Sequence, residues 1–502
     1  MNIMHSLGVL KMELTQTVVP EIIDLVATAL ADGRPVHEVE SGLWDLALQV
    51  GRRGLSAFLD AHGSGDVGQT VTLADGREVR RLEELHRRQY VSIFGSFTLQ
   101  RTVYGSREGQ TLEFVPLDNR LQLPPSDFSY VLQDWDQSLV MEQPFGQVSQ
   151  TMERILRFKQ SVDSLEGMNR QQAQDAGLFR DLQGSPPAAE EGQIVVVTAD
   201  CKGIVIRGQG TKTVCGGERP AGERANQKRM AAVAAVYTVD PYLRTPDEVV
   251  AALFRDPDYE PARRPEPCHK RVWASLPQEG PEPRSSIAVV FDWVWWEFAQ
   301  RNPRLARPTV CLCDGQEALW QACAESVRDD DRVEILDLLH VTPRLWAAGK
   351  LLYGEKSKEV LPFVRQRVTQ VLEGKVDSVI RTTRRLAQER GLPSAKKKAL
   401  GRINSYLNKN RQRMRYDQYL CHGYPIASGV IEGACRHLIK DRMERAGMHW
   451  TLPGAQAMLD LRSVWIGGHW QGFQQHRVER ETERLYPHRH LVAGEAFFTM
   501  AA

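Results

Sequence analysis

The chain has 502 residues, 42% of them hydrophobic and 25% charged, which is the composition of a soluble globular protein with room for roughly three or four domains. Its 64 basic and 63 acidic residues nearly cancel, so overall charge neither indicates nor excludes a nucleic-acid partner. The 8 cysteines include no Cys-x-x-Cys pair, which leaves a zinc knuckle and a disulfide framework unsupported and favours reduced thiols in a cytosolic protein.

Residues 1–66 have the pattern of a helical region. Between residues 12 and 60 apolar side chains recur at helical spacing, which predicts two or three amphipathic helices. The apolar run from Val18 to Leu30 is broken by Glu21 and Asp24, which argues against a signal sequence or a membrane span. We therefore expect a cytoplasmic protein without a membrane partner.

The next three segments change in character. Residues 67–125 contain the runs VTLADGREV and YVSIFGSFTLQRTVY, each with a turn at DG or GS, which predict two hairpins of a small sheet. Residues 126–180 are rich in helix formers, and their order is compatible with a DNA-reading helix-turn-helix or with a plain helical hairpin. Residues 181–193 contain Pro, Gly and acidic residues without periodicity, which predicts a linker at the main domain boundary.

Residues 194–340 have the pattern of an α/β core. The run IVVVTAD, continued by GIVI, predicts a central buried strand with Asp200 inside it. A second run, TVCLCDG, predicts a strand that ends at Asp314 and is followed by a helix. Further strands are predicted at residues 229–239, 269–276 and 332–336, and an aromatic helix at residues 285–300.

The acids of this core are candidate site residues. An unpaired charge inside a buried strand is costly, so Asp200 needs a metal ion, an Arg or a backbone cap as its partner. Asp314 stands at a strand end, where α/β proteins build their sites. His340, shortly after the last strand, is either a packed core histidine or part of such a site.

Residues 341–425 are expected to be almost wholly helical. Between residues 390 and 415 there are nine Lys or Arg and no acid, with Tyr406 among them and Tyr416 directly after them. Such a run of positive charge indicates either a nucleic-acid-binding surface or a solvated basic face. The candidate DNA-binding residues of this basic segment are Lys396, Lys397, Lys398, Arg402, Lys409, Arg411, Arg413 and Arg415.

Residues 426–502 open with a helix that carries Glu432 in its first turn. Such a carboxylate either complements the helix dipole or holds a hard cation. From Gly433 to Arg445 apolar residues recur at helical spacing, which predicts that Arg436, Lys440 and Arg442 share the other face. Arg436 and Lys440 are further candidate DNA contacts, and the last helix of the chain is expected to pack onto the sheet.

Between Ile194 and Arg462 the chain carries the blocks VVVTADCKG, KRMAAVAAVYTVDP, VCLCDG, ILDLLHV, NKNRQRMRYDQYLCHGYPIASGVIEGACRHLIKDRME and GMHW. In this order they resemble insertion-sequence transposases of the ISKra type, which are neighbours of the Mutator-like DDE transposases. The resemblance implies an RNase H-like catalytic domain with a mixed five-stranded sheet, divided between residues 194–340 and 426–502 by the all-helical insertion 341–425. For the first half it suggests an α+β DNA-binding region.

The resemblance also implies a site and a reaction. It assigns a DDE triad to Asp200, Asp314 and Glu432, which would hold two Mg²⁺ or Mn²⁺ ions, and it places His340 of a D-x-x-H signature near the active site or the DNA. Two such ions roughly 3.5–4 Å apart stabilise the attacking and leaving oxygens at phosphorus. We expect the three carboxyl groups to converge at one sheet edge, with the basic segment 390–415 facing an open groove.

The implied partner is double-stranded DNA, as the terminal inverted repeats of an insertion sequence and as the target. Cleavage exposes a 3′-hydroxyl that is joined to the target, and pairing of two ends favours a homodimer or a larger assembly. Two departures from the family are Cys201, where many relatives have Gly, and the lack of any Cys between Tyr104 and Leu123 for a zinc knuckle.

Other functions remain open. A regulator that keeps the fold and binds DNA without catalysis needs only the basic helices. A metal-dependent nuclease of the same fold would hydrolyse DNA without joining it. A purely structural helical scaffold leaves Asp200, inside an apolar strand, without an explanation.

Overall fold

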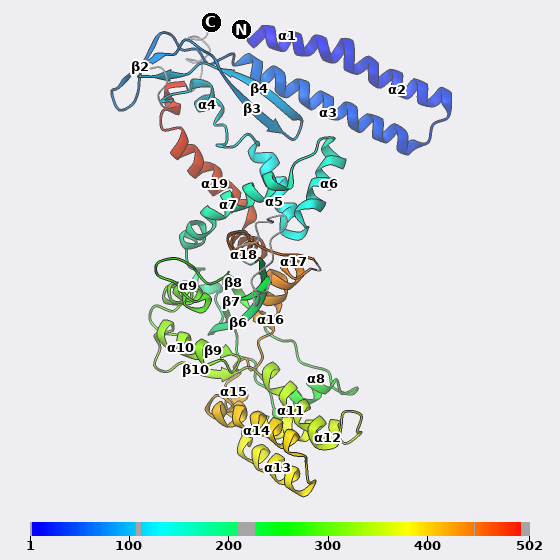
Figure 1. The fold of residues 1–502 in the computed structure, drawn as a ribbon, viewed down its shortest axis with the longest axis vertical. Coiled ribbons are helices and arrows are strands. Elements are labelled where there is room, and N and C mark those ends of the chain that lie inside the picture. The colour runs from blue at the N-terminus through cyan, green and yellow to red at the C-terminus, as the bar shows by residue number, and fades with distance from the viewer. Residues whose placement is uncertain (1–2, 107–111, 208–225, 446, 493–502) are drawn as a thin grey trace, which may run out of the picture. The chain divides into compact units, whose positions relative to one another are not determined.

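The computed structural model describes residues 3–106, 112–207, 226–445 and 447–492. The chain divides into two units, which are treated separately here. Unit 1 comprises Met1–Gln172 together with Gln471–Ala502, and unit 2 comprises Ala173–Trp470. Figure 1 labels the helices and strands of both units.

Unit 1 begins with a helical hairpin, which confirms helices in this region. Its first arm consists of α1 (Ile3–Glu13), the π-helical η1 (Leu14–Val18) and α2 (Val19–Asp32). Gly33, at a φ of 64°, ends α2 in the left-handed conformation that glycine adopts without strain. The second arm is α3 (Val36–Ala61), which packs alongside the first (Figure 1).

The first arm is also apolar enough to raise the question of a membrane. By length and composition, the stretch Met4–Asp32 is the one described helix that could cross a bilayer. A single such helix near an N-terminus is weak support for a membrane location, since signal sequences and core helices have the same composition.

The two hairpins predicted for residues 67–125 are present, but they belong to separate sheets. One sheet joins β1 (Thr70–Thr72), β2 (Glu78–Arg81) and β5 (Tyr104–Gly105). The other consists of β3 (His86–Ser92) and β4 (Gly95–Arg101). Leu99 of β4 packs with Leu59 of α3, which fixes the second sheet against the helical hairpin.

The remaining helices of unit 1 come from both ends of the chain. They are α4 (Pro116–Leu121), α5 (Tyr130–Glu142), α6 (Phe145–Leu156), the first part of α7 (Val162–Leu182), and, from Gln471 on, α19 (Trp470–Leu485) followed by η5 (Arg489–Val492). Buried Gln474 donates to the Gln172 side chain over 2.9 Å, and buried Arg477 lies over the Tyr130 ring. The prediction that the last helix belongs with the sheet is therefore wrong: α19 completes unit 1, because its buried polar residues find their partners there.

Unit 2 contains the mixed five-stranded sheet that the sequence predicts. Its strands are β6 (Ile194–Arg207), β7 (Asn226–Val239), β8 (Cys268–Ser275), β9 (Thr309–Cys313) and β10 (Val333–Leu336). The order is β10-β9-β6-β7-β8, with β6, β9 and β10 parallel and β7 antiparallel to both of its neighbours. Residues 194–199 are all buried, as expected for a central strand whose side chains are apolar on both faces.

Helices surround this sheet. Those on or near it are η2 (Ala188–Glu190), α9 (Ser286–Arg301), α10 (Glu317–Ser326), α16 (Gly429–Ala434), the π-helical η4 (Cys435–Lys440), α17 (Asp441–Met443) and α18 (Leu452–Ile466). The helix α8 (Pro246–Phe254) packs instead against the helical segment that follows β10. The segment after β10 is almost wholly helical, as predicted, and lies beside β9 and β10 (Figure 1). It comprises α11 (Leu338–Tyr353), α12 (Val360–Leu372), α13 (Val376–Glu389), α14 (Ser394–Lys409), η3 (Arg411–Arg413) and α15 (Tyr416–Cys421).

The end of the predicted linker is held firmly at the start of β6. Arg301 of α9 is fully buried, and its Nε donates to Glu191 Oε1 over 2.7 Å. The same guanidinium donates to the carbonyl oxygens of Val236 and His269, on β7 and β8. Buried ion pairs of this kind persist when hydrogen bonds satisfy the remaining donors, so Glu191 links the linker to the sheet.

Candidate metal centre

Three acids stand at the same level on three neighbouring parallel strands. The last residue pairs of these strands are Ala199 with Cys313 and Leu336 with Cys313. Asp200, Asp314 and Asp337 each come directly after those paired positions, and the Asp337 amide donates to the Cys313 carbonyl over 2.9 Å. Because parallel strands end at one edge of a sheet, β6, β9 and β10 together place three carboxyl groups there.

Glu432 reaches this edge from a separate helix. Ser428 precedes α16 and caps it by accepting a hydrogen bond from the Ile431 amide. The Ser428 hydroxyl is also 2.8 Å from the Thr198 hydroxyl, two residues before Asp200 on β6. This buried contact fixes the start of α16 to the central strand, so Glu432, one turn later, lies over the sheet edge.

His340 lies in the first turn of α11, directly after β10. Buried Asp337 caps that helix, accepting from the Leu339 amide over 2.8 Å, while its carbonyl accepts from the His340 amide. The His340 Nε2 is 3.5 Å from Glu432 Oε1. Asp337 therefore positions the imidazole beside the Glu432 carboxylate.

Ligand atoms from Asp200, His340 and Glu432 lie within 4.8 Å of one another. Asp314 is outside this group, and its Oδ1 accepts a hydrogen bond from the Gln316 amide at the start of α10. The structure thus brings together Asp200 and Glu432 with His340 beside them, as expected, but it leaves Asp314 outside the group that was expected to contain all three carboxyl groups. Asp314 lies on the adjacent strand end, where its charge still acts on Asp200.

The electrostatics of the cluster are those of crowded acids. Burial raises the pKa of the Asp200 carboxyl, and the nearby charges of Asp314 and Glu432 raise it further. The Cys201 amide, 2.7 Å from Asp200 Oδ1, and the His340 ring oppose that rise. Burial likewise raises the pKa of the Asp337 carboxyl to about 6.

This donor set fits a divalent cation. Two carboxylates and one imidazole converge from β6, α11 and α16, and a positive charge between them would offset the repulsion that raises the pKa of Asp200. Asp200, Glu432 and His340 would hold one ion. Asp314, next to Asp200, is the carboxylate available to a second.

The basic segment is anchored beside this edge. The Tyr406 ring of α14 packs directly on Gly315, so closely that a side chain at position 315 would overlap it. The Arg344 guanidinium covers the Tyr406 ring at 3.6 Å from its centroid. Since Gly315 follows Asp314, this contact fixes one face of α14 at the candidate site.

The cations of the basic segment have different environments. Exposed side chains belong to Lys396, Lys397, Lys398, Arg402, Arg411 and Arg415, and also to Arg436 and Lys440 on η4. Lys409 is exposed but pairs with Glu317 at 2.9 Å. Arg413 is 2.6 Å from Glu334 and lies over the Trp320 ring, which gives it a role in holding η3 to the sheet.

Arg442 is not on the exposed face that the helical periodicity predicts. It is 1% exposed and lies over the Trp450 ring. The physical reason is the π-helical η4, whose wider turn shifts every later residue around the helix axis relative to a regular α-helix. Buried Arg462 of α18 donates to the carbonyls of His437 and Leu438 within that turn.

Two parts of this site carry weaker signals in the sequence. Asp337, the first residue of the D-x-x-H signature, follows a predicted strand as Asp314 does, and that position is its signal. Cys435, whose thiol is 3.7 Å from Asp200 Oδ2, comes three residues after Glu432 and belongs to no motif that indicates a site. Burial and the Asp200 charge raise the pKa of the Cys435 thiol, so it remains a neutral donor.

Comparison with protein-family models and with curated proteins found no match.

Proposed function

We propose that this protein is a metal-dependent DNA transposase of the DDE type, related to the ISKra insertion-sequence enzymes. The observation that carries the proposal is the convergence of Asp200, Glu432 and His340, with Asp314 on the neighbouring strand end. Carboxylates from separate elements meeting at the edge of parallel strands suit hard divalent ions that bridge phosphates.

The fold supports the same proposal. The central strand β6 lies between a parallel and an antiparallel neighbour, and a helical segment separates the acids of the strands from Glu432. This order of elements is what an RNase H-like domain with a helical insertion requires. Under this proposal residues 341–425 are the insertion and residues 426–466 return to the core.

Each residue has a distinct role in the proposed reaction. Asp200 and Glu432 would hold one Mg²⁺ or Mn²⁺ ion, and Asp200 and Asp314 would hold a second. When bound, such ions would supply activation of the attacking oxygen and stabilisation of the charge that develops at phosphorus. His340, fixed by Asp337 at 3.5 Å from Glu432, orients that carboxylate or binds the ion itself.

The proposed substrate is double-stranded DNA: the terminal inverted repeats of the element and a target. The exposed lysines of α14 lie on the helix that Tyr406 fixes beside Asp314, so a phosphate backbone bound there would pass close to the acids. A homodimer or larger assembly would pair the two ends, and the reaction would take place in the cytoplasm.

The proposal is tested with a duplex carrying the DNA that flanks the gene, incubated with the full chain and Mn²⁺ or Mg²⁺. We expect metal-dependent nicking and joined products from the wild type, and a loss of at least about a hundredfold for Asp200→Ala, since a bridging carboxylate is removed. The matched control is Asp258→Ala, at an exposed acid outside the site.

The outcomes separate the three functions. If the wild type and Asp200→Ala nick DNA equally well, the acidic cluster takes no part in cleavage. Metal-dependent nicking without any joined product identifies a nuclease, because water and a 3′-hydroxyl compete as nucleophiles at the same site. Tight binding without nicking in either metal identifies a DNA-binding regulator.

A further inference from the structure

The helical hairpin of unit 1 leaves a row of large apolar side chains uncovered. On α2 these are Val19, Ile23, Val26 and Leu30, spaced by four, three and four residues. Ile23 is 63% exposed and Leu30 is 80% exposed. Apolar residues at this spacing form a continuous stripe of the kind that packs against another helix.

The second arm carries a matching stripe. Val36, Leu43 and Val50 of α3 are exposed and lie seven residues apart, and Phe58 extends the row by a further two turns. Between them stand small residues, Ala47 and Gly54, which leave room for a close approach.

Both stripes lie on the same side of the hairpin. Where the two arms pack together, Leu25 of α2 contacts Gly42 of α3. The residue after Leu25 is Val26 and the residue after Gly42 is Leu43, and both belong to the exposed stripes. One residue along a helix is a rotation of about 100°, in the same sense on both arms. Because the arms run antiparallel, that shared rotation brings both stripes to one face, which is termed here the apolar face.

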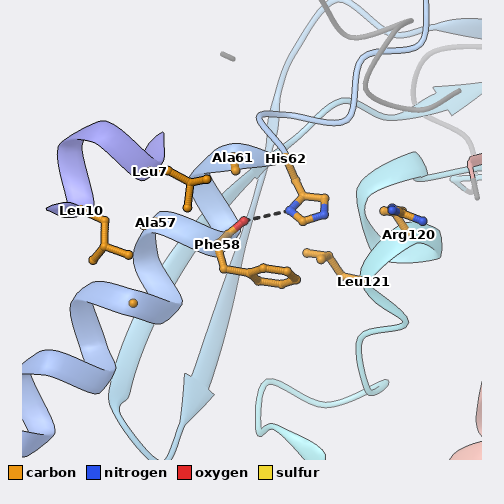
Figure 2. Close-up of a pocket in the computed structure, with 9 residues that line it drawn as sticks. Leu7, Leu10, Ala57, Phe58, Ala61, His62, Arg120 and Leu121 are labelled. Atoms are coloured by element: carbon orange, nitrogen blue, oxygen red, sulfur yellow. Dashed lines mark hydrogen bonds between the residues drawn. The ribbon is translucent and has the colours of Figure 1, made fainter. Parts of the chain in front are cut away.

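A cavity of about 430 Å³ opens at one end of the apolar face. Leu7 and Leu10 of α1 line it opposite Ala57, Phe58 and Ala61 of α3 (Figure 2). Its wall is mainly hydrocarbon, so it offers a hole for an apolar side chain from outside the hairpin.

We propose that a second copy of this chain covers the apolar face, so that two hairpins form an antiparallel four-helix bundle. The exposed apolar side chains of the face amount to on the order of 1,000 Å² per copy, against roughly 800 Å² per partner in a standard interface. That is more than the few hundred Å² that monomers leave uncovered. The inference rests on this surface and is independent of the proposed catalysis.

The test is sedimentation of the full chain at micromolar concentration, without DNA or metal. We expect a dimer for the wild type and at least a tenfold weaker dimer for Ile23→Glu, which places a charge in the interface. Ala31→Glu, at an exposed position on α2 away from the stripe, is the matched control and should leave the dimer unchanged. Circular dichroism of each variant confirms that the hairpin is folded.

A wild type that sediments as a monomer at all concentrations, or an Ile23→Glu protein that dimerises like the wild type, overturns the proposal. So does a monomer that co-sediments with neutral phosphatidylcholine vesicles through the same residues, because the apolar face would then meet a membrane. Neither result bears on cleavage by the acidic cluster.

Discussion

At the scale of single residues, the imidazole of His340 introduces a nitrogen donor among carboxylate oxygens. Mg²⁺ prefers oxygen ligands, whereas Mn²⁺ accepts imidazole more readily. We expect Mn²⁺ to bind more tightly than Mg²⁺, and His340→Gln to lower the Mn²⁺ affinity by about tenfold or more. Titration of Mn²⁺ into the DNA-free protein, followed by its electron paramagnetic resonance signal, measures this directly.

The matched control for that titration is His37→Gln, at an exposed position of unit 1. Equal Mn²⁺ affinity in the wild type and His340→Gln would show that the imidazole only orients Glu432. Activity measured in parallel would then separate a ligand from a positioning residue, because a positioning role lowers turnover without changing metal affinity.

A second residue-scale expectation concerns Asp136 of α5. Its carboxylate is fully buried, and burial raises its pKa to about 7, a rise that the neighbouring Gln160 side chain opposes. Because the folded pKa lies above the unfolded value, the protonated acid contributes stability at low pH, and that contribution is lost as the pH rises through 7. Between pH 5 and pH 8 unit 1 should lose roughly 1–3 kcal/mol from this group.

Asp136→Asn should remove most of that loss and raise the melting temperature at pH 8. Thermal unfolding followed by circular dichroism at both pH values measures the effect, with Asp127→Asn, at an exposed position, as the control. A variant whose melting temperature falls with pH as steeply as that of the wild type would rule out Asp136 as the source.

Individual residues show where sequence reasoning succeeds and where it stops. Asp200 was predictable because a carboxylate in an apolar β-branched run is conspicuous, and Asp314 because it ends such a run. The separation of Asp314 from the cluster was not predictable, since it depends on which backbone amide its side chain accepts from. The burial of Arg442 was not predictable either, because the apolar spacing in the sequence does not distinguish a π-helical turn from an α-helical turn.

At the scale of elements, the buried ion pairs around Arg301 are expected to contribute to the free energy of unfolding of unit 2. Arg301 bonds Glu191 and lies 3.6 Å from Glu297, and all three side chains are almost completely buried. Arg301→Ala would leave buried Glu191 without its cation, which costs about 3–5 kcal/mol, whereas Glu297 keeps Arg271 at 2.9 Å. Urea unfolding of unit 2 measures the change, and Arg304→Ala, at an exposed arginine, should cost less than about 0.5 kcal/mol.

A loss below about 1 kcal/mol for Arg301→Ala would mean that Glu191 becomes protonated or reaches water. In that case the end of the linker is held by something other than this ion pair. Unfolding at pH 5 and pH 8 distinguishes the two, because protonation makes the cost depend on pH.

The basic residues of α14 allow DNA binding to be tested at the same scale. Replacing the exposed Lys396, Lys397 and Lys398 by Ala removes three cations that a phosphate backbone would neutralise. We expect weaker binding to any duplex and a salt dependence whose slope falls by up to about three. Fluorescence anisotropy with a labelled duplex at several salt concentrations measures both quantities.

A double replacement of Lys356 and Lys358, exposed residues before α12, is the control for nonspecific charge. An equal loss of DNA affinity in both variants would show that α14 is an ordinary solvated basic face and not a specific DNA-binding surface. Arg413→Ala should instead lower stability, because its guanidinium is paired with Glu334 over Trp320.

At the scale of the whole molecule, periodicity predicted most of the elements but not how they group. The alternation in residues 67–105 and the apolar runs after residue 194 specify strands, because each strand must bury particular faces. The last helix shows the limit: its amphipathic pattern says that one face is buried but not against which partner. Only the fold shows that Gln474 and Arg477 meet Gln172 and Tyr130.

The discontinuity of unit 1 has a consequence for biosynthesis. Val492, close to the C-terminus, belongs to the same apolar cluster as Val79, Tyr104 and Phe114. During translation those early residues leave the ribosome long before Val492 exists, whereas every segment of unit 2 has already been made by then. Unit 1 therefore acquires its complete interior last. A message truncated after unit 2 would yield a chain with an intact acidic cluster and an unfinished N-terminal half, exposed to chaperones and proteases.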